Sequence, residues 1–228
     1  GAFDAAAPLL ERSLTLRREL SGAPPLDVAA SLNSLAVLRQ ETGAYATADS
    51  LFRAALAIQE EQRGPDDPIV AATLHNWGTL LHFQGQYDRA DSLFQRALTI
   101  RTAQFGEADP QTASTLNEIA SLRFDQDDLD GAEALYRQTL EVRQAHIEGD
   151  HPDVAASLNN LAWLYYNQGD YAAAEPIARR ALAMRIEVFG EAHVETTASM
   201  GSLAGILGRL ERYDEQAAIY RRALESLS

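Results

Sequence analysis

Two histidines and an acidic run are the residues whose types come closest to a metal site. His75 and His82 are seven residues apart, so on a helix they share a face but lie roughly 10 Å apart along its axis. One metal ion cannot join them without a third ligand between them. The acidic run 125–131 has Leu129 where a calcium loop needs an oxygen ligand, and Tyr136 where it needs a bidentate Glu. We expect no metal site, and we interpret the histidines as polar surface residues and the run as a solvated turn.

The residues that catalysis needs are absent or wrongly placed. Cys and Lys do not occur, which removes thiolate nucleophiles, a P-loop lysine and a Schiff-base lysine. The segment 201–205, Gly-Ser-Leu-Ala-Gly, is not the G-x-S-x-G pattern and lies in a helical pattern rather than at a strand-to-helix turn. No glycine-rich phosphate loop and no H-E-x-x-H motif is present. We expect that the chain is not an enzyme and uses no cofactor.

The charge balance argues against nucleic acid as a partner. The formal net charge is −14 and all 19 basic residues are Arg, whereas binding to phosphate backbones needs a basic face. No apolar run approaches the ~20 residues that span a bilayer, so we expect no membrane partner. A Lys-free, Arg-rich, acidic composition suits a GC-rich or salt-adapted microbe. The chain opens with Gly1 rather than Met, so we interpret it as a fragment of a longer, cytoplasmic bacterial protein that has lost any targeting signal.

The elements that position these residues follow from a period of 42. The segment 27–33 recurs as 153–159, an offset of 126 residues or three periods. Stepping by 42 along one position returns leucine every time: Leu14, Leu56, Leu98, Leu140, Leu182 and Leu224. No insertion breaks this register, which is typical of a protein built from stacked repeats.

Each period contains two helical patterns separated by a turn. In the fourth full period, apolar residues at i, i+3, i+4 and i+7 form one stripe of a helix: Leu158, Leu161, Ala162 and Tyr165. A turn with Gly169 follows, and then a second apolar pattern. In two of the linkers between periods, Asp67 and Asp109 precede proline, which predicts an N-cap with proline at the first helical position. Small residues predict close helix approach: Ala48, Ala90, Ala132 and Ala174.

These patterns predict an all-α chain of about 11 helices in a single domain, 1–228. It begins with a half repeat, 1–26, and five helix pairs follow near 27–68, 69–110, 111–152, 153–194 and 195–228. Each pair needs its neighbours to bury its apolar faces. An arginine also recurs near the end of the second helices, as Arg17, Arg101, Arg143 and Arg185, and we expect it to pair with acids or with the helix dipole.

The spacing Leu158-x2-Leu161-Ala162-x2-Tyr165, with Gly169-x-Tyr171 after it, resembles tetratricopeptide repeats. The period of 42 and the Gly-x-x-[Asp/His]-Pro linkers resemble the kinesin light chain type more closely. This resemblance covers essentially the whole chain and implies a right-handed superhelical α-solenoid. It also implies that the first helix of each pair lines a concave groove for a partner protein.

The resemblance assigns the groove by position. The residues carried over are Asn33, Val37, Gln40, His75, Asn76, Thr79, His82, Phe83, Asn117, Ser121, Phe124, Asn159, Asn160, Trp163, Tyr166 and Asn167. Asn recurs at one of these positions in three repeats, and an amide can pair with the backbone of an extended peptide. The alternative is that these amides bridge neighbouring repeats.

Aromatic residues interleave with the amides and could form pockets for apolar anchors: Phe83, Phe124, Trp163 and Tyr166. The alternative for Trp163 is packing against the adjacent helix. When the equivalent positions of the fifth pair are included, the only basic residue is Arg209, and the Lys/Arg carboxylate clamp of chaperone-binding relatives is missing. We therefore expect a neutral to basic protein or peptide partner with apolar anchors.

Two further functions stay open at this point. The chain could be a regulatory or assembly segment of a larger signalling protein, for example a kinase, because the resemblance includes kinases with such an array at the C-terminus. It could also self-associate, since Gly201, Gly205 and Gly208 would let another protomer approach the fifth pair closely.

Overall fold

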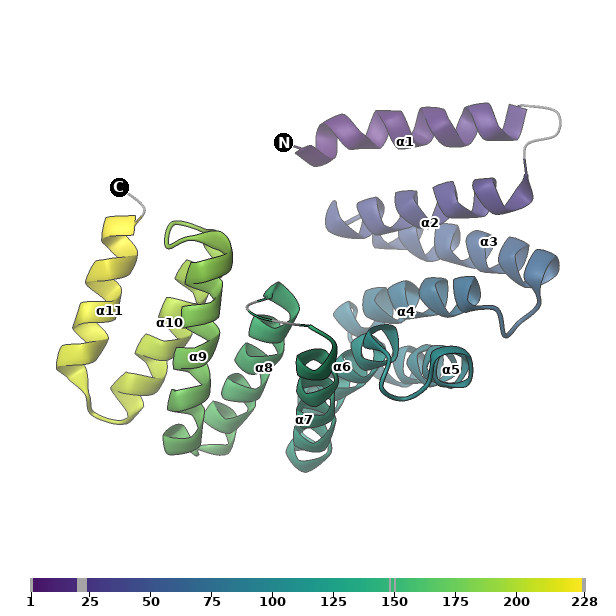
Figure 1. The fold of residues 1–228 in the computed structure, drawn as a ribbon. Helices are drawn as coiled ribbons and strands as arrows, with labels where there is room; N and C mark the ends of the chain where they lie inside the picture. The colour runs from purple at the N-terminus through teal and green to yellow at the C-terminus, as the bar shows by residue number, and fades with distance from the viewer. Residues whose placement is uncertain (1, 20–23, 148, 150, 227–228) are drawn as a thin grey trace. The chain divides into compact units, whose positions relative to one another are not determined.

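The structure describes residues 2–19, 24–147, 149 and 151–226, which form helices joined by short turns and linkers. In this computed structural model those residues form eleven α-helices and no strand (Figure 1). The all-α fold predicted from the sequence is confirmed. The helices fall into two compact units, Gly1–Glu107 (unit 1) and Ala108–Ser228 (unit 2).

Unit 1 holds the half repeat and two helix pairs. Its helices are α1 (Ala2–Glu19), α2 (Pro25–Glu41), α3 (Tyr45–Arg63), α4 (Pro68–Phe83) and α5 (Tyr87–Phe105). The helices α2 and α3 pack as one pair and α4 and α5 as the next, with α3 also against α4 (Figure 1).

Unit 2 holds three pairs in the same order. Its helices are α6 (Pro110–Asp125), α7 (Leu129–His146), α8 (Pro152–Gln168), α9 (Tyr171–Phe189), α10 (Val194–Arg209) and α11 (Tyr213–Ser226). Each second helix packs against the first helix of the following pair, α7 against α8 and α9 against α10. No helix, over the part of the chain that is described, combines the length and apolar character needed to cross a membrane.

Four of the five first helices, α4, α6, α8 and α10, begin at a side chain that caps them. Asp67 accepts the N–H of Ile69 at 2.9 Å, and Asp109 caps α6 in the same way, as the sequence predicted. In unit 2 the same position becomes His151 and then His193. Each imidazole accepts a backbone N–H through Nδ1 at 3.2 Å. A cap of this kind stabilises a helix by about 1 kcal/mol.

The turn inside each pair needs a left-handed residue. Gly43, Gly85 and Gly169 occupy it with φ of 77°, 71° and 80°. Asp127 and Glu211 take the same conformation with φ of 65° and 60° in the repeats that lack the glycine. The acidic run around Asp127 is therefore the solvated turn of its repeat, as expected from the sequence.

The core is built from the recurring small residues and the rings that face them. The four alanines predicted to allow close approach are fully buried: Ala48, Ala90, Ala132 and Ala174. Phe52 on α3 packs beside Leu80 on α4, and both are fully buried. Removing such a buried ring typically costs about 3–5 kcal/mol.

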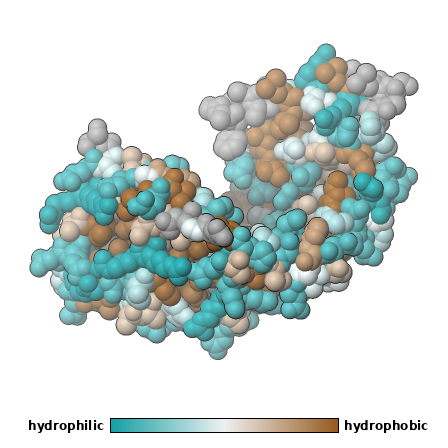
Figure 2. Space-filling model, in the orientation of Figure 1, coloured by the Kyte–Doolittle hydropathy of each residue, from teal (hydrophilic) through white to brown (hydrophobic). Residues whose placement is uncertain are grey.

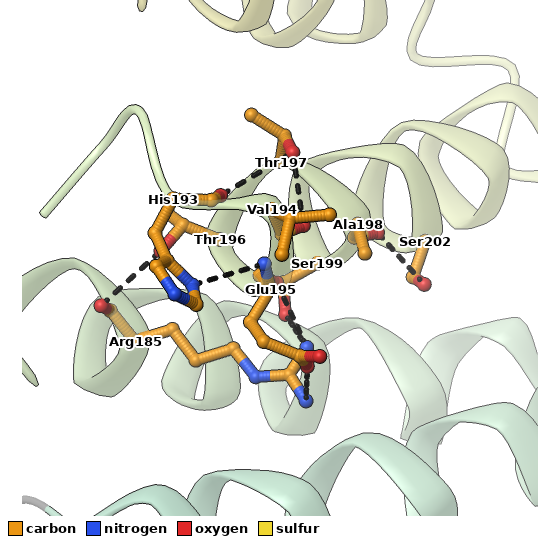
Figure 3. Close-up of polar contacts among 9 residues, drawn as sticks. All are labelled: Arg185, His193, Val194, Glu195, Thr196, Thr197, Ala198, Ser199 and Ser202. Carbon is orange, nitrogen blue, oxygen red and sulfur yellow. Dashed lines mark hydrogen bonds and ion pairs between the residues drawn. The ribbon is translucent and has the colours of Figure 1, made fainter. Parts of the chain in front are cut away.

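Three of the recurring arginines, Arg17, Arg143 and Arg185, join consecutive repeats. Arg185 on α9 donates from Nη1 to the main-chain oxygen of Glu195 at 2.9 Å and to the hydroxyl of Ser199 at 2.7 Å, both on α10 (Figure 3). Arg143 makes the same two bonds to Asp153 and Ser157 at 3.0 and 2.6 Å. The guanidinium thus satisfies a carbonyl and a buried hydroxyl of the next first helix, and Arg185 also pairs with the Glu195 carboxylate at 3.0 Å, as expected.

Gln59 takes the place of this arginine on α3. Its side chain is 2 % exposed, and its Oε1 has no hydrogen-bond partner among the described residues. The acid that follows ten residues after Arg17, Arg143 and Arg185 is replaced here by Ile69. The arginine and its acid are therefore lost together at this junction.

Candidate functional site

The predicted site residues lie on the first helices of four pairs, and each of them is exposed or half-buried. In unit 1, α2 and α4 carry Asn33, Val37, Gln40, His75, Asn76, Thr79, His82 and Phe83. In unit 2, α6 and α8 carry Asn117, Ser121, Phe124, Asn159, Asn160, Trp163, Tyr166 and Asn167. We call these sets the unit 1 surface and the unit 2 surface.

Amide pairs link neighbouring first helices on both surfaces. In unit 2, Asn160 donates from Nδ2 to the Oδ1 of Asn117 at 3.1 Å. In unit 1, Asn76 donates to Asn33 in the same sense at 3.5 Å. The bridging role left open by the sequence is therefore present for these four residues. Asn159 makes no such bond among the described residues.

The amide pairs keep much of their hydrogen-bonding capacity. An Asn side chain has two N–H donors and an oxygen that accepts twice, and the pair uses one donor and one acceptor. Asn117 also donates to the Oε1 of Glu118 at 3.4 Å, so its nitrogen points to the carboxylate and its oxygen to Asn160. The Glu118 carboxylate thereby orients both amides. The side-chain oxygen of Asn160, the last group in this series of hydrogen bonds, remains available as an acceptor.

A row of rings lies beside these amides on the unit 2 surface. The Trp163 indole stacks on Tyr166 with centroids 5.3 Å apart and an interplanar angle of 8°. Tyr166 meets the Tyr171 ring edge-on at 5.3 Å, and the Tyr171 hydroxyl accepts from Arg209 Nε at 2.9 Å. Trp163 remains 49 % exposed. It stacks on its own helix rather than packing against the adjacent one.

Four members of the unit 2 surface have partners inside the unit. Phe124 and Tyr166 are partly buried against the core of unit 2. The hydroxyl of Ser121 bonds that of Tyr136 on α7 at 2.9 Å, and Asn167 donates to the Trp163 carbonyl at 2.7 Å. The exposed recognition groups are therefore concentrated at the amides and at Trp163.

The Tyr136 hydroxyl reports the charge around this surface. Burial raises the pKa of Tyr136 to about 12, against the hydrogen bond from Ser121, and the carboxylates of Glu118 and Asp125 raise it further. Both acids belong to α6, one turn before and one turn after Ser121. The α6 side of the unit 2 surface thus carries two acidic residues, and the charge of Glu118 also acts on Arg143 of α7.

The unit 1 surface has fewer exposed recognition groups. Phe83 is 69 % exposed and its ring lies 5.5 Å from that of Tyr45. His82 meets the Tyr87 ring edge-on at 5.8 Å, and Thr79 bonds the main-chain oxygen of its own helix at 3.1 Å. These contacts are local, and they offer one exposed ring rather than a row.

His75 differs from the polar surface residue that we expected. Its ring packs edge-on to Phe94 at 6.0 Å, and its Nδ1 lies 3.5 Å from Nη1 of Arg101. Burial, and then the charge of Arg101, lower the pKa of His75 from 6.5 to about 4. The imidazole is neutral at neutral pH and serves packing more than recognition.

Residues that could bind a metal ion are not grouped together in the part of the chain that is described. No group of three or more His, Asp or Glu side chains there could hold an ion.

Most of the face shown in Figure 2 is hydrophilic, with hydrophobic residues in smaller patches. A hollow of about 770 Å³ in unit 2 is lined by second-helix residues such as Arg180, Met184 and Arg222 and includes no predicted site residue.

Two partners in this site were missed from the sequence. Glu118 orients the amides and Tyr171 supports the ring row, but neither was selected. A signal for Tyr171 existed, because an aromatic residue begins most second helices, as Tyr45, Tyr87, Tyr171 and Tyr213. Its role could not be inferred, because it depends on where the preceding helix ends.

The sequence pattern of the tetratricopeptide repeat matches residues 27–103, 111–187 and 166–228. The chain belongs to the tetratricopeptide repeat family. Such repeats bind protein partners, and their fold is generally a non-enzymatic scaffold. None of the curated proteins matches this tetratricopeptide repeat chain in sequence.

Solved structures of similar fold include kinesin light chain repeats. BtubC (BKLC) from P. vanneervenii has a TM-score of 0.83 and 26 % identity, covering 99 % of this chain and 91 % of its own. A kinesin light chain from Podosopora anserina, whose TPR-like repeats are nearly identical to one another, has a TM-score of 0.74 and 20 % identity. The match covers 90 % of this chain and 97 % of that one. The predicted tetratricopeptide repeat family is confirmed, and kinesin light chain-like repeat proteins are among its structural neighbours.

A Rap protein shares the fold at lower identity. Its complex with Competence and Sporulation Factor has a TM-score of 0.75 and 19 % identity, covering 96 % of this chain and 58 % of that one. This likeness shows the tetratricopeptide repeat fold alone.

Proposed function

We propose that the unit 2 surface binds an extended segment of a partner protein. The observation that carries this proposal is the oriented amide pair of Asn117 and Asn160 next to the half-exposed indole of Trp163. Main-chain N–H and C=O groups of any extended segment can pair with such amides, and an exposed ring supplies an anchor for a side chain.

The site needs little reorganisation for this task. Asn160 is held by Asn117, and Trp163 is held by Tyr166, so the contact groups are ordered before the partner arrives. Pre-organised groups lower the entropic cost of binding. For one short segment we expect an affinity near the micromolar range, which is roughly 8 kcal/mol. The complex of a Rap protein with Competence and Sporulation Factor is an example of this fold holding a separate factor.

Affinity capture from the lysate of the source organism tests the proposal. The baits are the wild type, an Asn160→Ala/Trp163→Ala variant, and a matched control, Phe105→Ala, which removes a ring that is 41 % exposed outside both surfaces. Circular dichroism first establishes that all three baits are folded. We expect to find proteins that bind to the wild type and to the control but not to the double variant. Equal retention by all three baits would refute binding at the unit 2 surface.

Self-association through α11 is a second candidate function, favoured by one observation. Leu224 is 71 % exposed, whereas Leu56 and Leu182, at the same position of other repeats, are 9 % and 5 % exposed. Leu182 is buried with Leu203 of the following first helix. A second copy could cover this face of α11, and light scattering of the wild type and Leu224→Gln tests it. We expect a dimer only for the wild type, so a wild type that stays monomeric at high concentration would exclude it.

Gly208 gives no support to self-association. A Cβ at Gly208 would lie 2.5 Å from the amide nitrogen of Gln216 on α11, so this glycine serves packing within unit 2. A Cβ at Gly201 or Gly205 would meet open space. The close-approach argument from the sequence therefore reduces to these two positions.

A further inference from the structure

The two tryptophans of the chain differ in how their rings are covered. The guanidinium of Arg53 lies over Trp77, 5.4 Å from the ring centroid. Trp163 stacks on Tyr166, and no arginine lies over it among the residues that the structure describes. With 49 % of its surface exposed, Trp163 presents a ring face that the chain itself does not cover.

The nearest cation along the ring row is already engaged. The guanidinium of Arg209 lies 5.2 Å from the Tyr171 centroid and donates to the Tyr171 hydroxyl at 2.9 Å. Tyr171 contacts Tyr166, and Tyr166 in turn contacts Trp163. Arg209 therefore occupies the end of the row away from Trp163.

Acidic residues lie on α6, the first helix of the repeat before that of Trp163. Ser121 holds the position of Trp163 one period earlier, on the neighbouring first helix, and Glu118 and Asp125 flank it. Hydrogen bonds lead from the Glu118 carboxylate through Asn117 to Asn160, which is one helical turn from Trp163. Among the α6 members of this face, at positions 117, 118, 121, 124 and 125, these acids are the charged residues.

We propose that Trp163 receives an arginine side chain of the bound segment, a proposal that rests on the function proposed above. The guanidinium would stack on the open face of the indole, and Glu118 and Asp125 of the neighbouring first helix would supply opposing charge. The side-chain oxygen of Asn160 would accept an N–H of the segment. Arginine fits better than lysine because its planar group stacks on a ring and still donates hydrogen bonds at its edge.

The test uses a displayed library of random 12-residue peptides. Selection runs in parallel on four folded proteins: the wild type, Trp163→Ala, Glu118→Gln and the Phe105→Ala control. Peptides recovered on the wild type are synthesised with a fluorescent label, and fluorescence anisotropy gives their dissociation constants. Each is compared with versions in which its arginine is replaced by lysine or by glutamine.

We expect arginine at one fixed place in the selected peptides. Its replacement by glutamine should weaken binding to the wild type about fivefold or more, and replacement by lysine should weaken it less. On Trp163→Ala the arginine and glutamine peptides should bind alike. Glu118→Gln should weaken the arginine peptide alone, and Phe105→Ala should change nothing.

Failure of this inference is distinguishable from failure of the proposed function. The selected peptides can lose affinity for an Asn117→Ala/Asn160→Ala variant and yet contain no arginine, or bind equally well when their arginine is replaced. In that case the arginine inference is wrong and the proposed binding surface stands. If no selected peptide depends on Asn117, Asn160 or Trp163, both proposals are wrong.

Discussion

Asn160 on α8 donates its side-chain N–H to the side-chain oxygen of Asn117 on α6 at 3.1 Å, across two consecutive repeats of unit 2. Asn76 and Asn33 make the same contact in the same sense in unit 1, at 3.5 Å. Since the separation is 43 residues both times, one period plus one residue, the contact is a property of the repeat. It joins two first helices at their surface, where a partner segment would meet them.

The amide pair should contribute measurably to stability. In a double-mutant cycle, we expect Asn117→Ala and Asn160→Ala each to lower the free energy of unfolding by about 0.5–1.5 kcal/mol. The double variant should lose less than the sum, with a coupling of about 0.5–1 kcal/mol. Urea unfolding at neutral pH measures all four proteins. Strict additivity would show that the contact does not form in solution.

The Arg185 junction should matter more than a surface ion pair. Arg185→Gln removes charge-assisted bonds to the Glu195 carbonyl and the Ser199 hydroxyl, and it leaves a buried hydroxyl without its donor (Figure 3). We expect a loss of about 2 kcal/mol in the free energy of unfolding. The matched control is Arg221→Gln on exposed α11, which should change stability by less than about 0.5 kcal/mol. Similar losses in both variants would contradict the junction role.

His75 should make stability depend on pH. Its pKa is lowered from 6.5 to about 4 in the folded protein, by burial and by Arg101. The unfolded chain therefore binds more protons between those values, and stability falls as the pH drops from 6.5 towards 4. Between pH 7.5 and pH 5 we expect the wild type to lose about 2 kcal/mol more than His75→Asn, which carries the residue found in three other repeats. Equal losses in urea unfolding would show that His75 is not buried as described.

The charge around Trp163 can be measured by quenching its fluorescence. In a Trp77→Phe background Trp163 is the only tryptophan, because the chain has two. Glu118 and Asp125 should attract caesium and repel iodide, so we expect caesium to quench more efficiently than iodide relative to free tryptophan. Glu118→Gln should reduce the difference, and neutral acrylamide should quench both proteins equally. A preference for iodide would mean that the surroundings of Trp163 are electropositive.

Much of the fold could be predicted because its signals are local. The period of 42, the caps at Asp67 and Asp109, and the left-handed turn at Asp127 each depend on a few neighbouring residues. The first helices consequently begin within two residues of the predicted starts, at Pro25 for 27 and at Val194 for 195. Helical periodicity and capping are properties that a single sequence carries.

The contacts within the candidate site depend on how repeats stack, which the period alone does not specify. The sequence placed Asn117 and Asn160 on the same kind of face, but their hydrogen bond depends on the offset between α6 and α8. His75 replaces an Asn in the pattern, yet its ring turns towards Phe94. The recurrence of arginine at position 185 is evident in the sequence. Its partner could not be predicted, because it is a main-chain carbonyl, which every residue has.

Photo-crosslinking from position 163 tests the central claim most directly. Trp163 is replaced by p-benzoylphenylalanine in one protein, and Phe105 in a second, and each is irradiated in lysate of the source organism. The account predicts a specific adduct from position 163 that an excess of unmodified wild type suppresses, and none from position 105. Adducts that form only from position 105 would contradict binding at the unit 2 surface. So would the absence of an adduct between position 163 and a protein that affinity capture retains.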